Sequence, residues 1–127
     1  YACGLDMTRR DLQFKARDKG RPWDFGKDFD HAAVIGTLAP ASVIGHPAKG
    51  GIRLTVNGQI KQNADIKDLI WSVPEIVANL SAYYPLRPGD LIYTGTPEGV
   101  GPVQPGDVLA GRIEGVGEIA LTIGQPL

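Results

Sequence analysis

An acid, a guanidinium and an amide lie close together near the start of the sequence. Asp6 follows a short apolar run, residues 1–5, that is typical of a buried strand. The residues after Asp6 favour a helix, with Thr8 as the candidate N-cap. On that helix Arg10 and Gln13 are three residues apart, so they share one face near the first turn. We therefore expect three polar groups to converge where the strand turns into the helix.

The expected helix has start and stop signals of its own. Asp11 stands three residues after Thr8, in the acidic position of a capping box. Leu12 and Ala16 give the helix an apolar stripe. Gly20 can end it in the left-handed conformation.

Lys27 is a second candidate for chemistry. It stands in an expected loop, residues 19–27, and it has aromatic residues on both sides, namely Trp23, Phe25 and Phe29. A solvated surface charge is the ordinary interpretation of such a lysine. The aromatic neighbours make a partly desolvated lysine an equal alternative, and loops on a rigid scaffold are where catalytic groups concentrate.

A glycine-rich segment, residues 95–101 (GTPEGVG), is the third candidate. It lacks the Lys-Ser/Thr ending of a phosphate-binding loop. Its backbone amides and the Thr96 hydroxyl could instead approach an anionic ligand. A tight loop between two strands is the plainer alternative.

The rest of the sequence predicts a mainly β body. Residues 52–62 alternate around Asn57-Gly58, which indicates a hairpin with a type I′ turn. Ser72, Pro74 and Glu75 predict a capped helix start, and the apolar face of this helix is Val73, Ile76, Val77 and Leu80. For Trp71, just before it, a core anchor is favoured over a residue that stacks on a ligand. Further strands are expected at 91–94, 108–113 and 118–123.

Composition argues against several other functions. The chain has 127 residues with a net charge of -1, which indicates neither a nucleic-acid partner nor a membrane-surface partner. No apolar stretch reaches the length of a membrane span. The single Cys3 lies in an apolar run, so a buried, inert thiol is favoured over a nucleophile, and a reducing, cytoplasmic setting is expected. His31 has no second ligand at metal-binding spacing, so a structural role is favoured.

Four segments, spread in order over nearly the whole chain, resemble the fumarylacetoacetate hydrolase family. They are residues 4–13 (GLDMTRRDLQ), residues 26–30 (GKDFD), the Asn57-Gly58 turn and residues 93–101 (YTGTPEGVG). Within the family, the sequences of these segments are most similar to the acylpyruvase type, including fumarylpyruvate hydrolases. The family's Glu-x-Glu metal pair and His-containing lid precede the first motif. We therefore expect residues 1–127 to be a single catalytic domain, incomplete at its N-terminal side.

The resemblance implies a fold and an activity. The fold is α+β and mainly β, a mixed β-sandwich or roll-like body with two or three short helices. The activity is metal-dependent hydrolysis of a C–C bond in a 1,3-diketo acid, foremost fumarylpyruvate, in the catabolism of aromatic compounds. The resemblance also implies a homodimer in the cytoplasm. The small molecule that it binds is the keto acid substrate.

The resemblance also assigns roles to residues. Asp6 is a ligand of Mg²⁺, or of Mn²⁺ or Ca²⁺, and the Glu-x-Glu pair supplies further oxygens. Lys27 binds substrate and is the catalytic residue that stabilises enolate charge. Arg10 and Gln13 orient the acid, and Thr96 binds a carboxylate. The general base belongs to the upstream His segment.

Three functions remain open at this point. The first is acylpyruvate hydrolysis, and the second is decarboxylation or isomerisation of a metal-bound keto acid with the same enolate stabilisation. The third is a catalytically inactive β-rich binding domain. For Asp6, the alternative to a metal ligand is a structural ion pair with Arg9 or Arg10.

Overall fold

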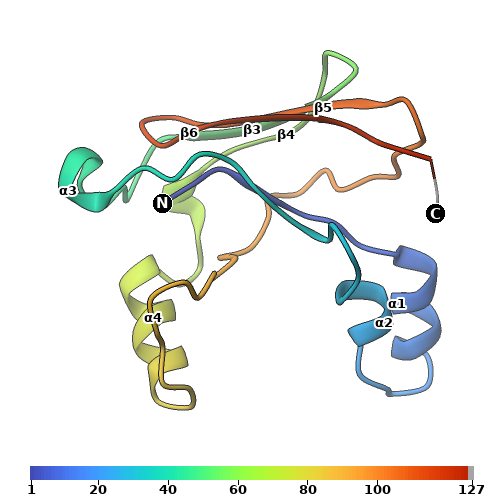
Figure 1. The fold of residues 1–127 in the computed structure, drawn as a ribbon, viewed down its shortest axis with the longest axis horizontal. Helices are drawn as coiled ribbons and strands as arrows, with labels where there is room; N and C mark the ends of the chain where they lie inside the picture. The colour runs from blue at the N-terminus through green and yellow to red at the C-terminus, as the bar shows by residue number, and fades with distance from the viewer. Residues whose placement is uncertain (126–127) are drawn as a thin grey trace.

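The computed structural model describes residues 1–125, and two antiparallel sheets form its body (Figure 1). The larger sheet has the strand order β4-β3-β5-β6. Its strands are β3 (Gly51–Val56), β4 (Gln59–Asp65), β5 (Val108–Ile113) and β6 (Gly117–Thr122). The smaller sheet pairs β1 (Gly4–Asp6) with β2 (Ala33–Ile35). The predicted α+β, mainly β fold is confirmed.

The described residues contain four helices, which is more than the two or three predicted. They are α1 (Arg10–Arg17), α2 (Asp24–Lys27), α3 (Ala41–Ile44) and α4 (Val73–Ser81), with a 3₁₀ turn at Ile66–Asp68. The additional helices, α2 and α3, have four residues each. Figure 1 shows α1 with α2, and separately α4, below the same side of the large sheet, with β1 between them. Within residues 1–125, no helix is long and apolar enough to cross a membrane.

The face of the large sheet that lies toward β1, here called the inner face, contains the buried centre. Leu109 and Gly111 on β5 belong to it, and Leu109 is 2% exposed. A Cβ on Gly111 would lie 3.3 Å from the Sγ of Cys3, so the missing side chain at Gly111 lets β1 approach. Burial raises the pKa of the Cys3 thiol, and the charge of Glu118 raises it further. The prediction of a buried, inert thiol agrees with this position.

The hairpin of β3 and β4 confirms the prediction for Asn57-Gly58, because both residues have positive φ, 51° and 77°. A register shift lies between Leu54 and Thr55. Leu54 is opposite Gln62, whereas Thr55 is opposite Ile60. Lys61 is therefore an extra residue on β4, a β-bulge.

The bulge decides which side chains of β4 face inward. Leu54 is opposite Gly111 on its other side, so Gln62 belongs to the inner-face row. Gln62 is only 8% exposed, whereas Ile60 is 57% exposed. In a regular strand, residues two positions apart lie on the same face. The extra residue is the reason that Ile60 and Gln62 do not.

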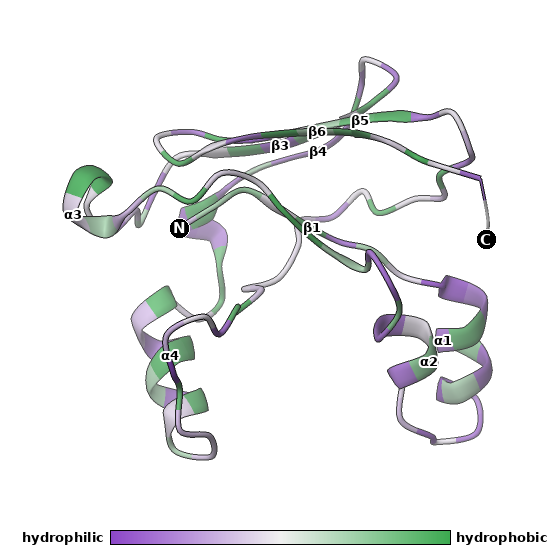
Figure 2. Cartoon of the chain, viewed as in Figure 1, coloured by the Kyte–Doolittle hydropathy of each residue, from purple (hydrophilic) through white to green (hydrophobic). Residues whose placement is uncertain are grey.

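Helix α4 begins as predicted. The Ser72 Oγ accepts from the Glu75 backbone N–H, and a Glu75 carboxylate oxygen accepts from the Ser72 N–H at 2.7 Å. The hydrogen bonds from Ser72 lower the pKa of Glu75. Trp71 is 56% exposed and Val77 38%, so within the described residues Trp71 is not the core anchor that was expected. Figure 2 shows α4 to be more hydrophobic than the largely hydrophilic α1.

The prediction of a strand at residues 91–94 is wrong, since this segment pairs with no strand among the described residues. Instead the Tyr93 hydroxyl donates to the Val34 carbonyl of β2 at 2.9 Å. The strands expected at 108–113 and 118–123 are confirmed as β5 and β6. A single side-chain hydrogen bond therefore stands where a strand was expected to pair.

Candidate active site

Lys27 and Asp6 form the centre of the site. The Lys27 Nζ donates to Asp6 Oδ1 at 2.5 Å and to Thr8 Oγ1 at 3.0 Å. Asp6 is the last residue of β1 and Lys27 the last residue of α2, which forms where a loop was predicted. The Lys27 side chain is 32% exposed and that of Asp6 is 49% exposed. Lys27 is therefore neither a freely solvated charge nor a fully desolvated one.

The chain holds this pair in place with backbone contacts. The Met7 N–H donates to the Ala32 carbonyl at 2.8 Å, and the Arg9 N–H donates to the Gly26 carbonyl at 2.9 Å. A Cβ on Gly26 would lie 2.9 Å from the backbone nitrogen of Gln13, which is closer than Cβ atoms normally come. The glycine before Lys27 is thus required for the close approach of α2 to α1.

Thr8 has a different role from the predicted N-cap. Helix α1 begins at Arg10, and its N-cap, Arg9, makes no side-chain capping hydrogen bond. Asp11 forms no capping box but an exposed ion pair with Lys15 at 3.6 Å. The Thr8 hydroxyl accepts from Lys27 instead, so sequence reasoning misassigned a residue of the site.

Arg10 and Gln13 lie together, as their spacing predicts. The Arg10 guanidinium donates to Gln13 Oε1 at 2.7 Å. Gln13 is only 8% exposed, and its backbone lies against Gly26. This pair therefore adjoins the segment that carries Lys27. No ion pair of the described residues joins Asp6 to Arg9 or Arg10, so the structure does not form the Asp–Arg pair.

Thr96 lies in a separate part of the site, against strand β4. Gln62 Nε2 donates to Thr96 Oγ1 at 2.8 Å and to the Pro97 carbonyl at 2.6 Å. Gly99, with φ of 97°, lies so close to the Lys61 carbonyl that a Cβ would overlap that oxygen. The glycine-rich segment is therefore seated on the bulge of β4. Sequence reasoning missed Gln62, because nothing in the alternation indicates where a bulge falls.

Tyr93 connects this segment to β1. Its ring is 3.0 Å from the position that a Cβ on Gly4 would occupy. Burial raises the pKa of Tyr93, and the nearby negative charge of Asp6 raises it further. Among residues 1–125, no hydrogen bond or ion pair joins Thr96 directly to Asp6 or Lys27. Tyr93 was also missed as a site neighbour, although it opens the YTGTPEGVG motif.

The described residues supply only part of the ligand set that a metal ion needs. Within the described chain, no three His, Cys, Asp or Glu side chains lie close enough together to hold an ion. Mg²⁺ needs about six oxygens. Asp6 offers a carboxylate at an exposed strand end, which suits one position of such a set. The described residues do not make a metal site by themselves.

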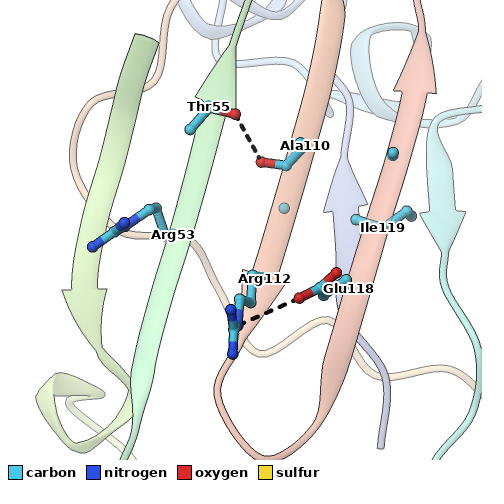
Figure 3. A pocket seen from close by; sticks show the side chains of 8 residues that line it. Arg53, Thr55, Ala110, Arg112, Glu118 and Ile119 are labelled. Atoms are coloured by element: carbon cyan, nitrogen blue, oxygen red, sulfur yellow. Dashed lines mark hydrogen bonds and ion pairs between the residues drawn. The ribbon is translucent and has the colours of Figure 1, made fainter. Parts of the chain in front are cut away.

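The hollow drawn in Figure 3 is not this site. It lies on the outer face of the large sheet and is lined by Arg53, Thr55, Ala110, Gly111, Arg112, Glu118, Ile119 and Ala120. Arg112 and Glu118 form an ion pair at 3.5 Å, and both side chains are about 70% exposed. None of the residues predicted for chemistry lines it, so we assign it no role in the reaction.

Comparison with known proteins gives the same family as the sequence motifs. The family described as fumarylacetoacetate (FAA) hydrolase C-terminal matches residues 1–124. The chain belongs to the fumarylacetoacetate hydrolase family. It is 59% identical over 124 residues to a fumarylpyruvate hydrolase of Ralstonia sp, covering 98% of this chain and 64% of that protein. It is 36% identical to a mitochondrial oxaloacetate tautomerase of Homo sapiens, covering 99% of this chain and 57% of that one.

Solved structures agree in fold. The crystal structure of fumarylpyruvate hydrolase from Pseudomonas aeruginosa in complex with Mn²⁺ and pyruvate superposes with a TM-score of 0.97 at 54% identity. The match covers 99% of this chain and 54% of that one. The chain thus spans between half and two thirds of the length of these members of the fumarylacetoacetate hydrolase family.

Proposed function

We propose that this chain is part of a hydrolase that cleaves the C–C bond of an acylpyruvate, foremost fumarylpyruvate. The observation that carries the proposal is the contact of the Lys27 ammonium with Asp6 and Thr8, within motifs shared with the family. It is supported by the 59% identity to the Ralstonia sp fumarylpyruvate hydrolase. The reaction adds water across the bond and gives fumarate and pyruvate.

Lys27 supplies positive charge where the reaction develops negative charge. Hydroxide from water bonds to the acyl carbon, and the electron pair of the broken C–C bond passes to the pyruvate fragment as an enolate. A fixed ammonium in a partly buried place stabilises such charge more than water does. Thr8 and Asp6 hold the ammonium in position before the substrate arrives. The enolate then takes a proton to become pyruvate.

The remaining side chains bind the acid groups. Arg10, held by the buried Gln13, presents a guanidinium, which suits a carboxylate. Thr96 and the nearby amides of the glycine-rich segment offer donors to the other carboxylate, the one beside the keto group, which pyruvate also carries. The general base is proposed to lie outside residues 1–127.

Asp6 is proposed as one ligand of a divalent cation, Mg²⁺ or Mn²⁺, with further oxygens from outside this chain. When bound, such an ion would polarise a substrate carbonyl and stabilise the negative charge that develops on the substrate. The proposal is supported by the Mn²⁺ in the Pseudomonas aeruginosa structure. A homodimer and a cytoplasmic location remain predictions.

The test is a product assay with the complete protein in ¹⁸O-labelled water. Hydrolysis predicts fumarate and pyruvate in equal amounts, with one labelled oxygen in a fumarate carboxylate. Unchanged fumarylpyruvate, with Mg²⁺ or Mn²⁺ present, would contradict the proposal.

A second candidate is isomerisation of a keto acid, supported by the identity to oxaloacetate tautomerases. The same ammonium would stabilise the enolate that links keto and enol forms. Interconversion of oxaloacetate tautomers is followed by absorbance. Rapid interconversion without cleavage of fumarylpyruvate would favour this candidate over hydrolysis.

A further inference from the structure

We propose that Gln62 fixes the direction of the Thr96 hydroxyl, so that this hydroxyl presents its hydrogen to a ligand carboxylate. Gln62 is then a positioning residue, which acts through Thr96. The inference rests on the proposed function, because Thr96 must face the carboxylate of a keto acid.

Gln62 is a buried amide on a strand whose partners define its surroundings. It is 8% exposed and lies in the inner-face row with Leu54 and Gly111. A buried amide without partners is costly, so its hydrogen bonds determine how it sits. Among the described residues, no buried side-chain nitrogen or oxygen lacks a partner.

The Pro97 carbonyl determines which end of the amide faces the loop. A carbonyl oxygen can only accept a hydrogen bond, and this one is 2.6 Å from Gln62 Nε2. The reversed amide would place oxygen against oxygen. The nitrogen must therefore lie here, and its second hydrogen reaches Thr96 Oγ1 at 2.8 Å.

The donor role of Thr96 follows from this assignment. A hydroxyl has one hydrogen to donate, and Thr96 Oγ1 already accepts from Gln62. Its hydrogen is therefore directed elsewhere, and Thr96 is exposed. A carboxylate only accepts, so it suits a hydroxyl held in this way. The loop is also fixed, because Gly99 lies against the Lys61 carbonyl.

A plain alternative is that Gln62 only braces the loop. A brace predicts lower stability and a general loss of function, whether or not Thr96 has a hydroxyl. A positioning role predicts that the effect of Gln62 on ligand affinity depends on that hydroxyl. The two roles can be separated by a double-mutant cycle.

The experiment measures pyruvate binding by calorimetry at saturating Mn²⁺ in the complete protein. Gln62→Leu and Thr96→Val should each weaken binding about tenfold or more, the scale of a lost hydrogen bond to a charged group. The double variant should bind within about twofold of Thr96→Val. The KM for fumarylpyruvate should rise in Gln62→Leu by a larger factor than kcat falls.

The control is Gln59→Leu, which makes the same change at an exposed position of the same strand. It should leave pyruvate binding within twofold. Thermal unfolding of every variant reports whether the fold survives. Thr96→Ser keeps the hydroxyl without the methyl group, and should retain binding.

Several results would overturn the inference. These are additive losses in the double variant, unchanged binding in Gln62→Leu, and absence of pyruvate binding in the wild type. Should Gln62→Leu fail to fold, Gln62→Met replaces it, since Met keeps an unbranched side chain of similar length and has no hydrogen to donate to Thr96 Oγ1. The ¹⁸O assay judges the hydrolase proposal separately, because pyruvate binding does not require cleavage.

Discussion

The ammonium of Lys27 lies 2.5 Å from a carboxylate oxygen of Asp6, although the two residues are 21 positions apart in the chain. Each is the last residue of its element, β1 for Asp6 and α2 for Lys27. Thr8, two residues after Asp6, also accepts from the ammonium. The proposed charge-stabilising group and the proposed metal ligand are thus coupled before any substrate binds.

Lys27→Ala should lower kcat for fumarylpyruvate by about a hundredfold or more, the effect of removing one transition-state donor. Steady-state kinetics of the complete protein measure it. Lys15→Ala is the matched control, because Lys15 is exposed and, among residues 1–125, its one ion pair is with Asp11. A Lys27→Ala protein with normal kcat and merely weaker binding would remove Lys27 from the catalytic role.

Asp6→Asn should weaken the binding of Mn²⁺, because a neutral amide replaces a charged oxygen. Activity should fall sharply and recover in part with excess Mn²⁺ or Mg²⁺, since concentration offsets affinity. If Asp6 is only the partner of Lys27, the cost is about 1 kcal/mol or less of folding free energy and metal affinity is kept. Metal titration decides between the two, with Asp11→Asn as control.

Gly26→Ala should destabilise the fold and disturb the site together. The new Cβ would lie 2.9 Å from the Gln13 backbone nitrogen, so α2 must move away from α1. Overpacking of this kind costs about 1–3 kcal/mol. Denaturant unfolding and kcat measure the two effects. At Gly124 no described residue would lie within 4 Å of a new Cβ, so Gly124→Ala should change neither.

Asp107→Asn should make the free energy of unfolding fall less steeply as the pH is lowered. The Gln104 backbone N–H and the Asn57 side chain lower the pKa of Asp107 in the folded protein. A lowered folded pKa gives stability above the unfolded pKa, and this is lost as the pH falls through the folded value. Denaturant unfolding from pH 7 down to acid measures it. Asn57→Gly keeps the left-handed backbone and removes one donor, so it should flatten the curve less; identical curves for all three proteins would contradict this.

Local signals were enough for several parts of the molecule. The Asn57-Gly58 turn, the capping box of Ser72 and Glu75, and the shared face of Arg10 and Gln13 each depend on residues a few positions apart. Such features follow from backbone preferences and short spacings. The position of Asp6 at the end of a strand was predictable for the same reason.

The errors arose where distant contacts compete with local ones. Thr8 is a good N-cap by type, but its hydroxyl accepts from Lys27, 19 residues away. Residues 91–94 have the composition of a strand, yet Tyr93 contacts β2 through its side chain, and these residues form no ladder with any described strand. Gln62 became buried through a bulge, which sequence alternation does not reveal.

The bulge at Lys61 has a consequence for any attempt to idealise this sheet. Deleting Lys61 would leave Ile60 opposite Thr55 and Gln62 opposite Leu54, which is a fully regular ladder. The same deletion would take away the carbonyl against which Gly99 is seated. A more regular hairpin would then carry a looser ligand loop, so at this edge regularity of the sheet and precision of the site are opposing demands.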